Sequence, residues 1–512
     1  MANSLSHIRR LIATARTLAR YDALFPLEPL PAATAPLAIL KLLFRRRSTD
    51  RPGVRLAKAC QVLGPSFIKL GQSLSTRPDL LGEDVAQDLS HLQDQLPPFS
   101  ASDARRIIEE ELGAPVDELF QSFDDTPVAA ASIAQVHLAV TSDGDEVAVK
   151  VLRPGIERAF SDDIDFFRWL ARIVERNRPD LRRLKPIDVI ETFAESVRLE
   201  MDLRLEAAAA EELAENFAGD PDYRIPAIDW QRTARRVLTL ERVSGIPIDE
   251  KEKLTAAGHD LEQIVTKAGA IFFKQVFRDG FFHADQHPGN LFVADDGAIV
   301  AIDFGIMGRI DRAERRYLGE MLMSFLKRDY RRVAEVHFEA GYVSPRQSVQ
   351  AFTQACRSIA EPILDKPQNE ISMARLLAHL FQVTETFEME TQPQLLLLQK
   401  TMLVAEGIGR TLCPDANIWL LAQPLIEEWV EQNMGPETQI VEATEEVVGS
   451  LRRLPRILSN VEKSAAMFTD GGLKLHPETL RQMTGGGRTD RSLAKWLYSV
   501  VAILLIGWLI FG

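Results

Sequence analysis

Three oxygen-bearing side chains near the middle of this 512-residue chain have the types and spacing needed for phosphate chemistry. Asp285 lies within the sequence FFHADQHPGN, Asn290 ends it, and Asp303 begins an Asp-Phe-Gly triplet. An aspartate can orient an attacking hydroxyl group or water and accept its proton, while hard oxygen ligands hold Mg²⁺ on a triphosphate. We therefore expect Asp285 to be catalytic, and Asn290 and Asp303 to bind Mg²⁺.

A short hairpin must bring these groups together. Residues 291–293 and 299–302 are apolar and flank an Asp-Asp-Gly turn, so they predict two antiparallel strands that place Asp303 opposite the loop of Asp285. Either motif alone would be weak, because His-x-Asp and Asp-x-Gly triplets occur by chance. Together, at a separation of eighteen residues, they indicate the ATP-binding cleft of a kinase-like fold.

A strand upstream supplies the cation that such a cleft requires. Residues 146–151 read Glu-Val-Ala-Val-Lys-Val, so the three valines face one side and Lys150 points to the other. The alternative is an exposed lysine on an edge strand. Directly before the strand of Lys150 lie a second predicted strand, at 133–140, and a turn at Asp143-Gly144. This context favours Lys150 as a phosphate contact.

The usual glycine-rich phosphate loop is absent, and an alanine-rich segment takes its place. Alanine is less free than glycine in the left-handed region, so we expect a stiffer loop, with Ser132 and Gln135 adding side-chain hydrogen bonds. Asp303 is followed by no Ala-Pro-Glu motif and no long activation segment, which argues against ordinary protein phosphorylation. The predicted ATP-binding loop comprises Val128, Ala129, Ala130, Ala131, Ser132, Ile133, Ala134, Gln135 and Val136.

With these motifs, the chain resembles the UbiB family of atypical kinase-like ATPases, the bacterial relatives of mitochondrial coenzyme Q kinase-like proteins. The resemblance extends roughly from Leu63 to Pro414. It rests on the SIAQVH sequence in the alanine-rich loop, on Lys-x-Gly-Gln at Lys69–Gln72, and on Glu-x-Asp at Glu200–Asp202. Most members have proline after the catalytic aspartate, where this chain has Gln286.

The resemblance implies an α+β, atypical protein-kinase-like bilobal fold with ATP and Mg²⁺ as ligands. It implies that Glu206 pairs with Lys150, and that Glu241 and Val243 belong to the hinge that contacts adenine. It also implies a regulatory group, in which the helix of Lys69 and Gln72 folds over the nucleotide pocket and Lys69 pairs with Glu200, beside Asp202. From spacing alone, an ordinary surface helix would explain the Lys69 stripe equally well.

The family also implies a role in ubiquinone biosynthesis, in which ATP hydrolysis supports the handling of polyprenylated quinone precursors. Two alternatives stay open: a phosphotransferase acting on a small phenol, a lipid or a protein, and a non-catalytic nucleotide-binding scaffold for other ubiquinone biosynthesis enzymes. Direct hydroxylation of 2-polyprenylphenol is disfavoured, because the chain lacks both a Rossmann-type glycine motif and di-iron ligands.

The net charge of -13 is unevenly distributed and argues against nucleic-acid binding. Residues 1–58 carry eleven basic and three acidic side chains, and residues 449–495 carry nine and four. These basic ends fit anionic membrane lipids. At the start of the chain, Leu5, Ile8, Leu11 and Ile12 recur with helical spacing among arginines and predict a basic amphipathic helix, for which a lipid-bound helix and a plain surface helix are equally good interpretations.

The C-terminal seventeen residues, 496–512, are uncharged and apolar, with aromatic side chains near both ends and basic residues on one flank. We predict a single membrane span that anchors a cytoplasmic body to the inner (cytoplasmic) membrane. Three distant cysteines indicate neither a disulfide framework nor a zinc site. The expected domains are a helical extension (1–96), an N-lobe (97–240), a helical C-lobe (241–436), a basic connector (437–492) and a transmembrane helix (493–512).

Overall fold

The computed structural model of the chain describes residues 2–25, 49–75, 81–90, 92, 96–177, 186–362, 383–384, 386–387, 389, 393–414 and 429. The chain divides into two units, Met1–Met434 and Gly435–Gly512, and every described residue belongs to the first. The predicted connector and the predicted membrane span lie outside the described residues. Within the described ranges, no helix is long and apolar enough to cross a membrane.

Helices α3 (Pro52–Leu63) and α4 (Pro65–Ser75) are the central pair of the N-terminal extension. Each begins with proline, which suits the first turn of a helix because an N–H there has no partner within the helix. Gly64 joins them with a φ of 105°, where a side chain would be strained. Gly71 permits close packing, since a Cβ at this position would lie 2.8 Å from Cδ2 of Leu92. The motif glycine thus has a steric role.

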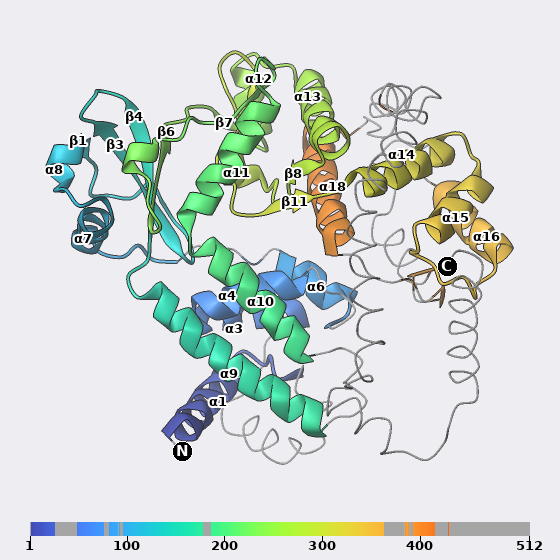
Figure 1. The fold of residues 1–512 in the computed structure, drawn as a ribbon, viewed down its shortest axis with the longest axis horizontal. Helices are drawn as coiled ribbons and strands as arrows, with labels where there is room; N and C mark the ends of the chain where they lie inside the picture. The colour runs from blue at the N-terminus through green and yellow to red at the C-terminus, as the bar shows by residue number, and fades with distance from the viewer. Residues whose placement is uncertain are drawn as a thin grey trace, which may run out of the picture. The chain divides into compact units, whose positions relative to one another are not determined.

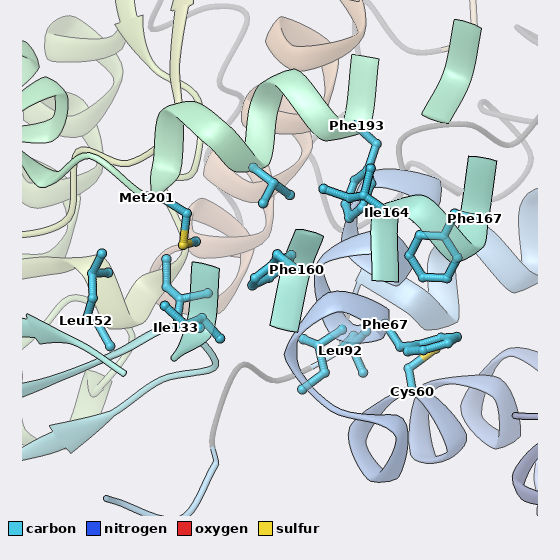
Figure 2. Packing of buried hydrophobic residues seen from close by; sticks show 14 of the residues in the cluster. Cys60, Phe67, Leu92, Ile133, Leu152, Phe160, Ile164, Phe167, Phe193 and Met201 are labelled. Atoms are coloured by element: carbon cyan, nitrogen blue, oxygen red, sulfur yellow. The ribbon is translucent and has the colours of Figure 1, made fainter. Parts of the chain in front are cut away.

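The extension shares one apolar core with the neighbouring helices and the first sheet (Figure 2). Phe67 of α4 meets Phe167 edge to face, with ring centroids 5.1 Å apart, and the same cluster includes Ile133 and Leu152. Hydrophobic burial therefore ties the helix of Lys69 to the lobe that carries Lys150. The other helices around this core are α1 (Ala2–Arg20), α6 (Glu83–Ser90), α9 (Ile156–Asn177) and α10 (Pro186–Glu200).

Helix α1 is amphipathic as expected, but its apolar face packs against the protein. Ala15 and Ala19 are buried, and Leu11 and Leu18 pack against the shared core. Among the described side chains of this helix, Ile12 is a large apolar residue that stays exposed, at 59% of its surface. The outward face is therefore mainly basic.

The first sheet has the strand order β1-β3-β4-β6, and β2 also pairs with β3 (Figure 1). On one face, the three valines of β4 pack with Ile107 and Ile108 of α7 (Ala101–Leu112), next to the short α8 (Val116–Leu119). The opposite face contributes to the core shared with the extension. The strands are β1 (Phe120–Phe123), β2 (Ala129–Ala130), β3 (Ala134–Thr141), β4 (Glu146–Leu152) and β6 (Val237–Glu241).

A second sheet, ordered β5-β10-β9-β7, and the separate pair β8–β11 support the predicted catalytic residues. Strand β5 precedes the predicted lobe boundary at 240 yet pairs with β10 beyond it, so the lobes are not separated at that point. The strands are β5 (Tyr223–Arg224), β7 (Ile246–Pro247), β8 (Phe281–His283), β9 (Leu291–Val293), β10 (Ile299–Ala301) and β11 (Met307–Arg309).

Further helices complete the described part of the fold, and some of them share one apolar core with the second sheet. The expected combination of helices and sheets is confirmed for these residues. The helices are α11 (Leu203–Asn216), α12 (Lys251–Ala256), α13 (Leu261–Phe273), α14 (Arg312–Leu326), α15 (Tyr330–Glu339), α16 (Val349–Ala360) and α18 (Pro393–Leu412), with a π-helical turn at Lys274–Asp279 and short 3₁₀ turns at Trp230–Arg232 and Pro288–Asn290.

Candidate active site

Lys150 is the centre of the candidate site. The alternation of β4 directs it away from the buried valines, as the sequence predicts, and its ammonium lies between two carboxylates. Its Nζ donates to Oε1 of Glu206 at 2.7 Å and to Oδ2 of Asp303 at 3.1 Å. Glu206 comes from the first turn of α11, whereas Asp303 follows β10. One lysine thus joins residues from three separate parts of the chain.

Ion pairing and hydrogen bonding, acting against burial, fix the charges of Lys150 and Asp303. Burial opposes the charge on Lys150, but the charges and hydrogen bonds of Asp303 and Glu206 outweigh it, so the pKa of Lys150 is raised. Burial also acts to raise the pKa of Asp303, yet Lys150 and the N–H of Gly305 hold this pKa far below its usual value. For Glu206 burial prevails, and the pKa is raised. Lys150 and Asp303 are therefore ionised at neutral pH.

Asp285 and Asn290 lie together in the loop after β8. Asn290 donates its side-chain N–H to the backbone oxygen of Asp285 at 3.0 Å, with a longer contact of 3.4 Å to Oδ2. Nδ1 of the fully buried His283 accepts the N–H of Asp285 at 3.2 Å. The predicted β9–β10 hairpin is confirmed, and the N–H of Ile302 donates to the backbone oxygen of Asn290 at 3.1 Å. The hairpin therefore joins the loop to the segment leading to Asp303.

The donor set of Asn290 and Asp303 suits a hard cation. Asp303 is ionised and 44% exposed, and the contacts of Asn290 use its amide nitrogen, leaving its carbonyl oxygen available. Among the residues that the structure describes, no group of three or more His, Cys, Asp or Glu side chains could hold a metal by itself. A cation held here would take further oxygen ligands from phosphate and water, which is the usual manner of Mg²⁺ binding.

The alanine-rich segment forms a tight hairpin. Ala129 and Ala130 pair with Val136 and Gln135, and the N–H of Ala131 donates to the backbone oxygen of Ala134 at 2.8 Å. Val128 is 57% exposed, whereas Ile133 is buried. The segment is therefore a short, hydrogen-bonded hairpin, and its stiffness stays a prediction.

The two polar side chains of the hairpin are turned inward. Gln135 is fully buried, accepts the N–H of Phe99 at 2.9 Å and lies 2.8 Å from Nε2 of His137. A hydrogen bond from this side chain to a phosphate, as expected from the sequence, would break these contacts. Ser132 is also fully buried, and its Oγ has no hydrogen-bond partner among the described residues. This inward orientation could not be predicted, because the order of residues in the motif does not indicate which side chains are buried.

The predicted hinge links the two sheets. Glu241 ends β6, accepts the N–H of Ala227 on its side chain at 3.2 Å, and is exposed. Val243 is half-buried in the link to β7. At Gly245 a Cβ would lie 2.8 Å from the backbone oxygen of Val293, so the link passes close to the catalytic hairpin.

One contact of the regulatory group expected from the family, the pair of Lys69 with Glu200, is present at the extension. Lys69 pairs with Glu200 at 2.9 Å, and both side chains are 12% exposed. Gln72 donates to the backbone oxygen of Leu92 at 3.5 Å, which fastens α4 locally. Asp202 caps α11 by accepting the N–H of Arg204, so the Glu-x-Asp motif leads directly into the helix that carries Glu206.

Three contacts of the site were missed from the sequence. Nζ of Lys400 on α18 donates to Oδ1 of Asp285 at 2.9 Å. Gln275 in the π-helical turn accepts the N–H of His283 at 2.9 Å, and Arg153 donates to the backbone oxygen of Ala131. No motif includes these side chains, and their partners are distant in sequence or are backbone atoms, so periodicity gives no signal for them.

Comparison with known proteins yields two adjoining family matches. The ABC1 atypical kinase-like domain matches residues 91–337, and the UbiB helical domain matches residues 356–417. "Probable protein kinase UbiB" of Marinobacter nauticus is 40% identical, covering 99% of this chain and 94% of that protein. The protein of the same name from Azotobacter vinelandii is 43% identical, with coverages of 88% and 85%. A structure of Rv3197 with erythromycin, from Mycobacterium tuberculosis, is 27% identical with a TM-score of 0.49, covering 78% of this chain and 98% of that one. The first matched range contains Lys150, Asp285 and Asp303.

Proposed function

The chain belongs to the UbiB family of atypical kinase-like proteins, and we propose that it is a membrane-anchored, Mg²⁺-dependent ATPase that supports ubiquinone biosynthesis. Its ATP hydrolysis would serve the handling of polyprenylated quinone precursors, in contact with other enzymes of that biosynthesis. The contact of Lys150 with both Glu206 and Asp303 carries the proposal, because it brings a fixed cation to the two carboxylates that a triphosphate site requires.

The chemistry follows from the positions of the charged groups. Asp285 orients a water molecule and accepts its proton as the water oxygen bonds to the γ-phosphorus. The bond from this phosphorus to the β–γ bridging oxygen breaks, and ADP leaves. Asn290 and Asp303 would hold Mg²⁺, which when bound neutralises phosphate charge. Lys150 contacts Asp303 in the described structure and would exchange this contact for a phosphate oxygen, while Glu206 keeps the ammonium in place.

Membrane attachment is the second part of the proposal. The exposed face of α1 presents Arg9, Arg16 and Arg20, with Ile12 among them. Because its apolar side packs against the protein, α1 would meet anionic lipid by charge and not by insertion. The uncharged sequence 496–512, which lies outside the described residues, would supply the anchor.

Phosphate release from ATP tests the proposed activity. The purified full chain would be incubated with ATP, Mg²⁺ and vesicles that contain cardiolipin, with neutral phosphatidylcholine vesicles for comparison. We expect release that depends on Mg²⁺, rises with the anionic vesicles and is lost in Asp303→Asn. Asp117→Asn is the matched control, because Asp117 is 92% exposed and distant in sequence from the catalytic segments. Release that persists in Asp303→Asn would contradict the proposal.

The biosynthetic role requires a measurement in cells. Replacing Asp303 by Asn at the chromosomal locus should lower ubiquinone and cause a prenylated intermediate to accumulate, as measured by mass spectrometry. Normal ubiquinone content in Asp285→Asn cells would instead favour a scaffold that needs no catalysis.

Phosphotransfer to a small phenol or lipid is the second candidate. The short path after Asp303 favours a small acceptor over a protein, since β11 ends at Arg309 and α14 begins at Arg312. No long segment stands between them on which a peptide could be laid. Label from γ-labelled ATP would appear in a polyprenyl phenol in this case, and in inorganic phosphate if water is the acceptor.

A further inference from the structure

Lys400 reaches the catalytic loop from the second matched family region. Its Nζ lies 2.9 Å from Oδ1 of Asp285, although the two residues are 115 positions apart. The side chains of Lys400 and Asp285 are 29% and 34% exposed, so the pair is partly shielded from solvent. The ABC1 match ends at residue 337 and the UbiB helical match covers 356–417. The two matched regions therefore meet at the carboxylate that the proposed reaction uses as a base.

Apolar anchors on both sides of Lys400 hold α18 in place. Leu398 is 7% exposed and belongs to the same core cluster as Phe282 and Ala284, which flank His283 in the catalytic segment. Further along α18, Ile408 and Leu412 pack in the cluster that contains Leu291 of the catalytic hairpin. A side chain between two such anchors has little freedom to move away, because displacing it would expose buried apolar surface on both sides.

The two oxygens of Asp285 are left in different environments. Oδ1 accepts the ammonium hydrogen of Lys400, whereas among the described residues Oδ2 has only the 3.4 Å contact with the amide of Asn290. Lys400 therefore fixes the rotation of the carboxylate and leaves Oδ2 as the oxygen available to an attacking group. An exposed ion pair would contribute little, but this one is partly buried and attached to a loop already held by His283 and Asn290.

We propose that Lys400 is a positioning residue for Asp285, supplied by the helical region to complete the active site of the kinase-like region. This inference rests on the proposed ATP hydrolysis, in which Asp285 accepts the proton of the attacking water. Lys400 acts through Asp285 alone, so it contributes to turnover and not to nucleotide affinity.

Steady-state ATP hydrolysis by the full chain tests the inference. Lys400→Ala should lower kcat by about 10- to 100-fold, since general-base catalysis contributes about 10²–10⁴-fold and positioning accounts for part of it. KM for ATP should stay within about twofold, because in the described part of the chain no contact of Lys400 reaches the loop or the hinge expected to hold the nucleotide. Lys400→Arg should restore part of kcat. Thr411→Ala, an exposed site on the same helix, should match the wild type.

A double substitution separates positioning from a general effect on folding. In an Asp285→Asn background, Lys400→Ala should lower kcat no further, because its target carboxylate is already gone. A further fall in this background, an unchanged kcat in the folded single variant, or an equal fall in Thr411→Ala would each overturn the inference.

A wild type that does not hydrolyse ATP would refute the proposed function itself. In that event, amide hydrogen exchange tests the inference about Lys400 separately. In the nucleotide-free protein, Lys400→Ala should increase amide exchange in residues 281–290, whereas Thr411→Ala should not. Unchanged exchange at 281–290 would then overturn the inference about Lys400.

Discussion

Two lysine–glutamate pairs, Lys69–Glu200 and Lys150–Glu206, have similar local geometry and different surroundings. The ammonium-to-carboxylate distances are 2.9 and 2.7 Å, and the two glutamates are six residues apart in sequence. Lys69 joins two helices, α4 and α10. Lys150 also contacts Asp303 at 3.1 Å, across to the segment that follows the catalytic hairpin.

The difference shows how the same pair of residue types serves two purposes. The Lys69 pair belongs to the contact between the extension and α10, around a shared apolar core. The Lys150 pair leaves an ionised carboxylate, Asp303, partly open to solvent and within reach of a cation. Both lysines therefore form an ion pair with a glutamate. Only the pair of Lys150 also includes a second carboxylate, that of Asp303, which could take part in a reaction.

Loss of Lys150 should have the largest effect. In Lys150→Met, Glu206 and Asp303 face each other without a cation, and ATP hydrolysis should fall by about 10²–10³-fold, the scale for removing one preorganised charge donor. Lys253→Met is the control, because its pair with Glu250 is exposed. Phosphate release measures both variants. Equal phosphate release by Lys150→Met and Lys253→Met would contradict a role of Lys150 in the reaction.

Loss of Lys69 should instead affect stability. Lys69→Met leaves Glu200 buried without its cation, and the free energy of unfolding should fall by about 3 kcal/mol, the scale for breaking a buried pair. ATP hydrolysis by the folded variant should stay within about tenfold of the wild type. Lys58→Met removes an exposed pair with Asp50 and should cost less than about 1 kcal/mol. Urea unfolding measures the free energy of unfolding of Lys69→Met and Lys58→Met. Equal decreases in the two variants would contradict the burial of the Lys69–Glu200 pair.

Asp202 tests the connection between the two pairs. It caps the N-terminus of α11, one turn before Glu206. Asp202→Ala should lower the free energy of unfolding by about 1 kcal/mol, whereas Asp202→Asn keeps an acceptor for the cap and should cost only a few tenths. Thermal unfolding of both variants measures the difference. If the alanine and asparagine variants were equally stable, the cap would contribute nothing.

The titration of one buried histidine, His137, in mild acid should have the smallest effect, and the Lys150 site should stay charged. The raised pKa of Lys150 and the lowered pKa of Asp303 keep both groups ionised from pH 7 to pH 6. Burial lowers the pKa of His137, so the unfolded chain binds the proton more readily and stability falls as the pH drops through 6.5. The loss from this residue is at most about 0.7 kcal/mol between pH 7 and pH 6. In urea unfolding, the free energy of unfolding of His137→Gln should fall correspondingly less between pH 7 and pH 6 than that of the wild type. An equal fall in the two proteins would exclude His137 as the source of the pH dependence.

Much of the site could be predicted because its signals are local. The alternation of β4 orients Lys150, the hairpin brings Asp303 back toward Asp285, and both follow from periods of two and from turn residues. The inward orientation of Gln135 could not be predicted in this way. The orientation depends on contacts of the Gln135 side chain with the backbone of Phe99 and the ring of His137. These contacts exist only after the sheet has formed.

The sequence by itself determined which residues are available for phosphate chemistry, since motif spacing and strand alternation act over a few residues. Tertiary structure alone decided that Lys150 touches Asp303 and that Lys400 holds Asp285. These contacts span 153 and 115 positions. They exist because apolar burial brings whole helices and sheets together, and the position of each charged side chain is then fixed by packing that no local pattern records.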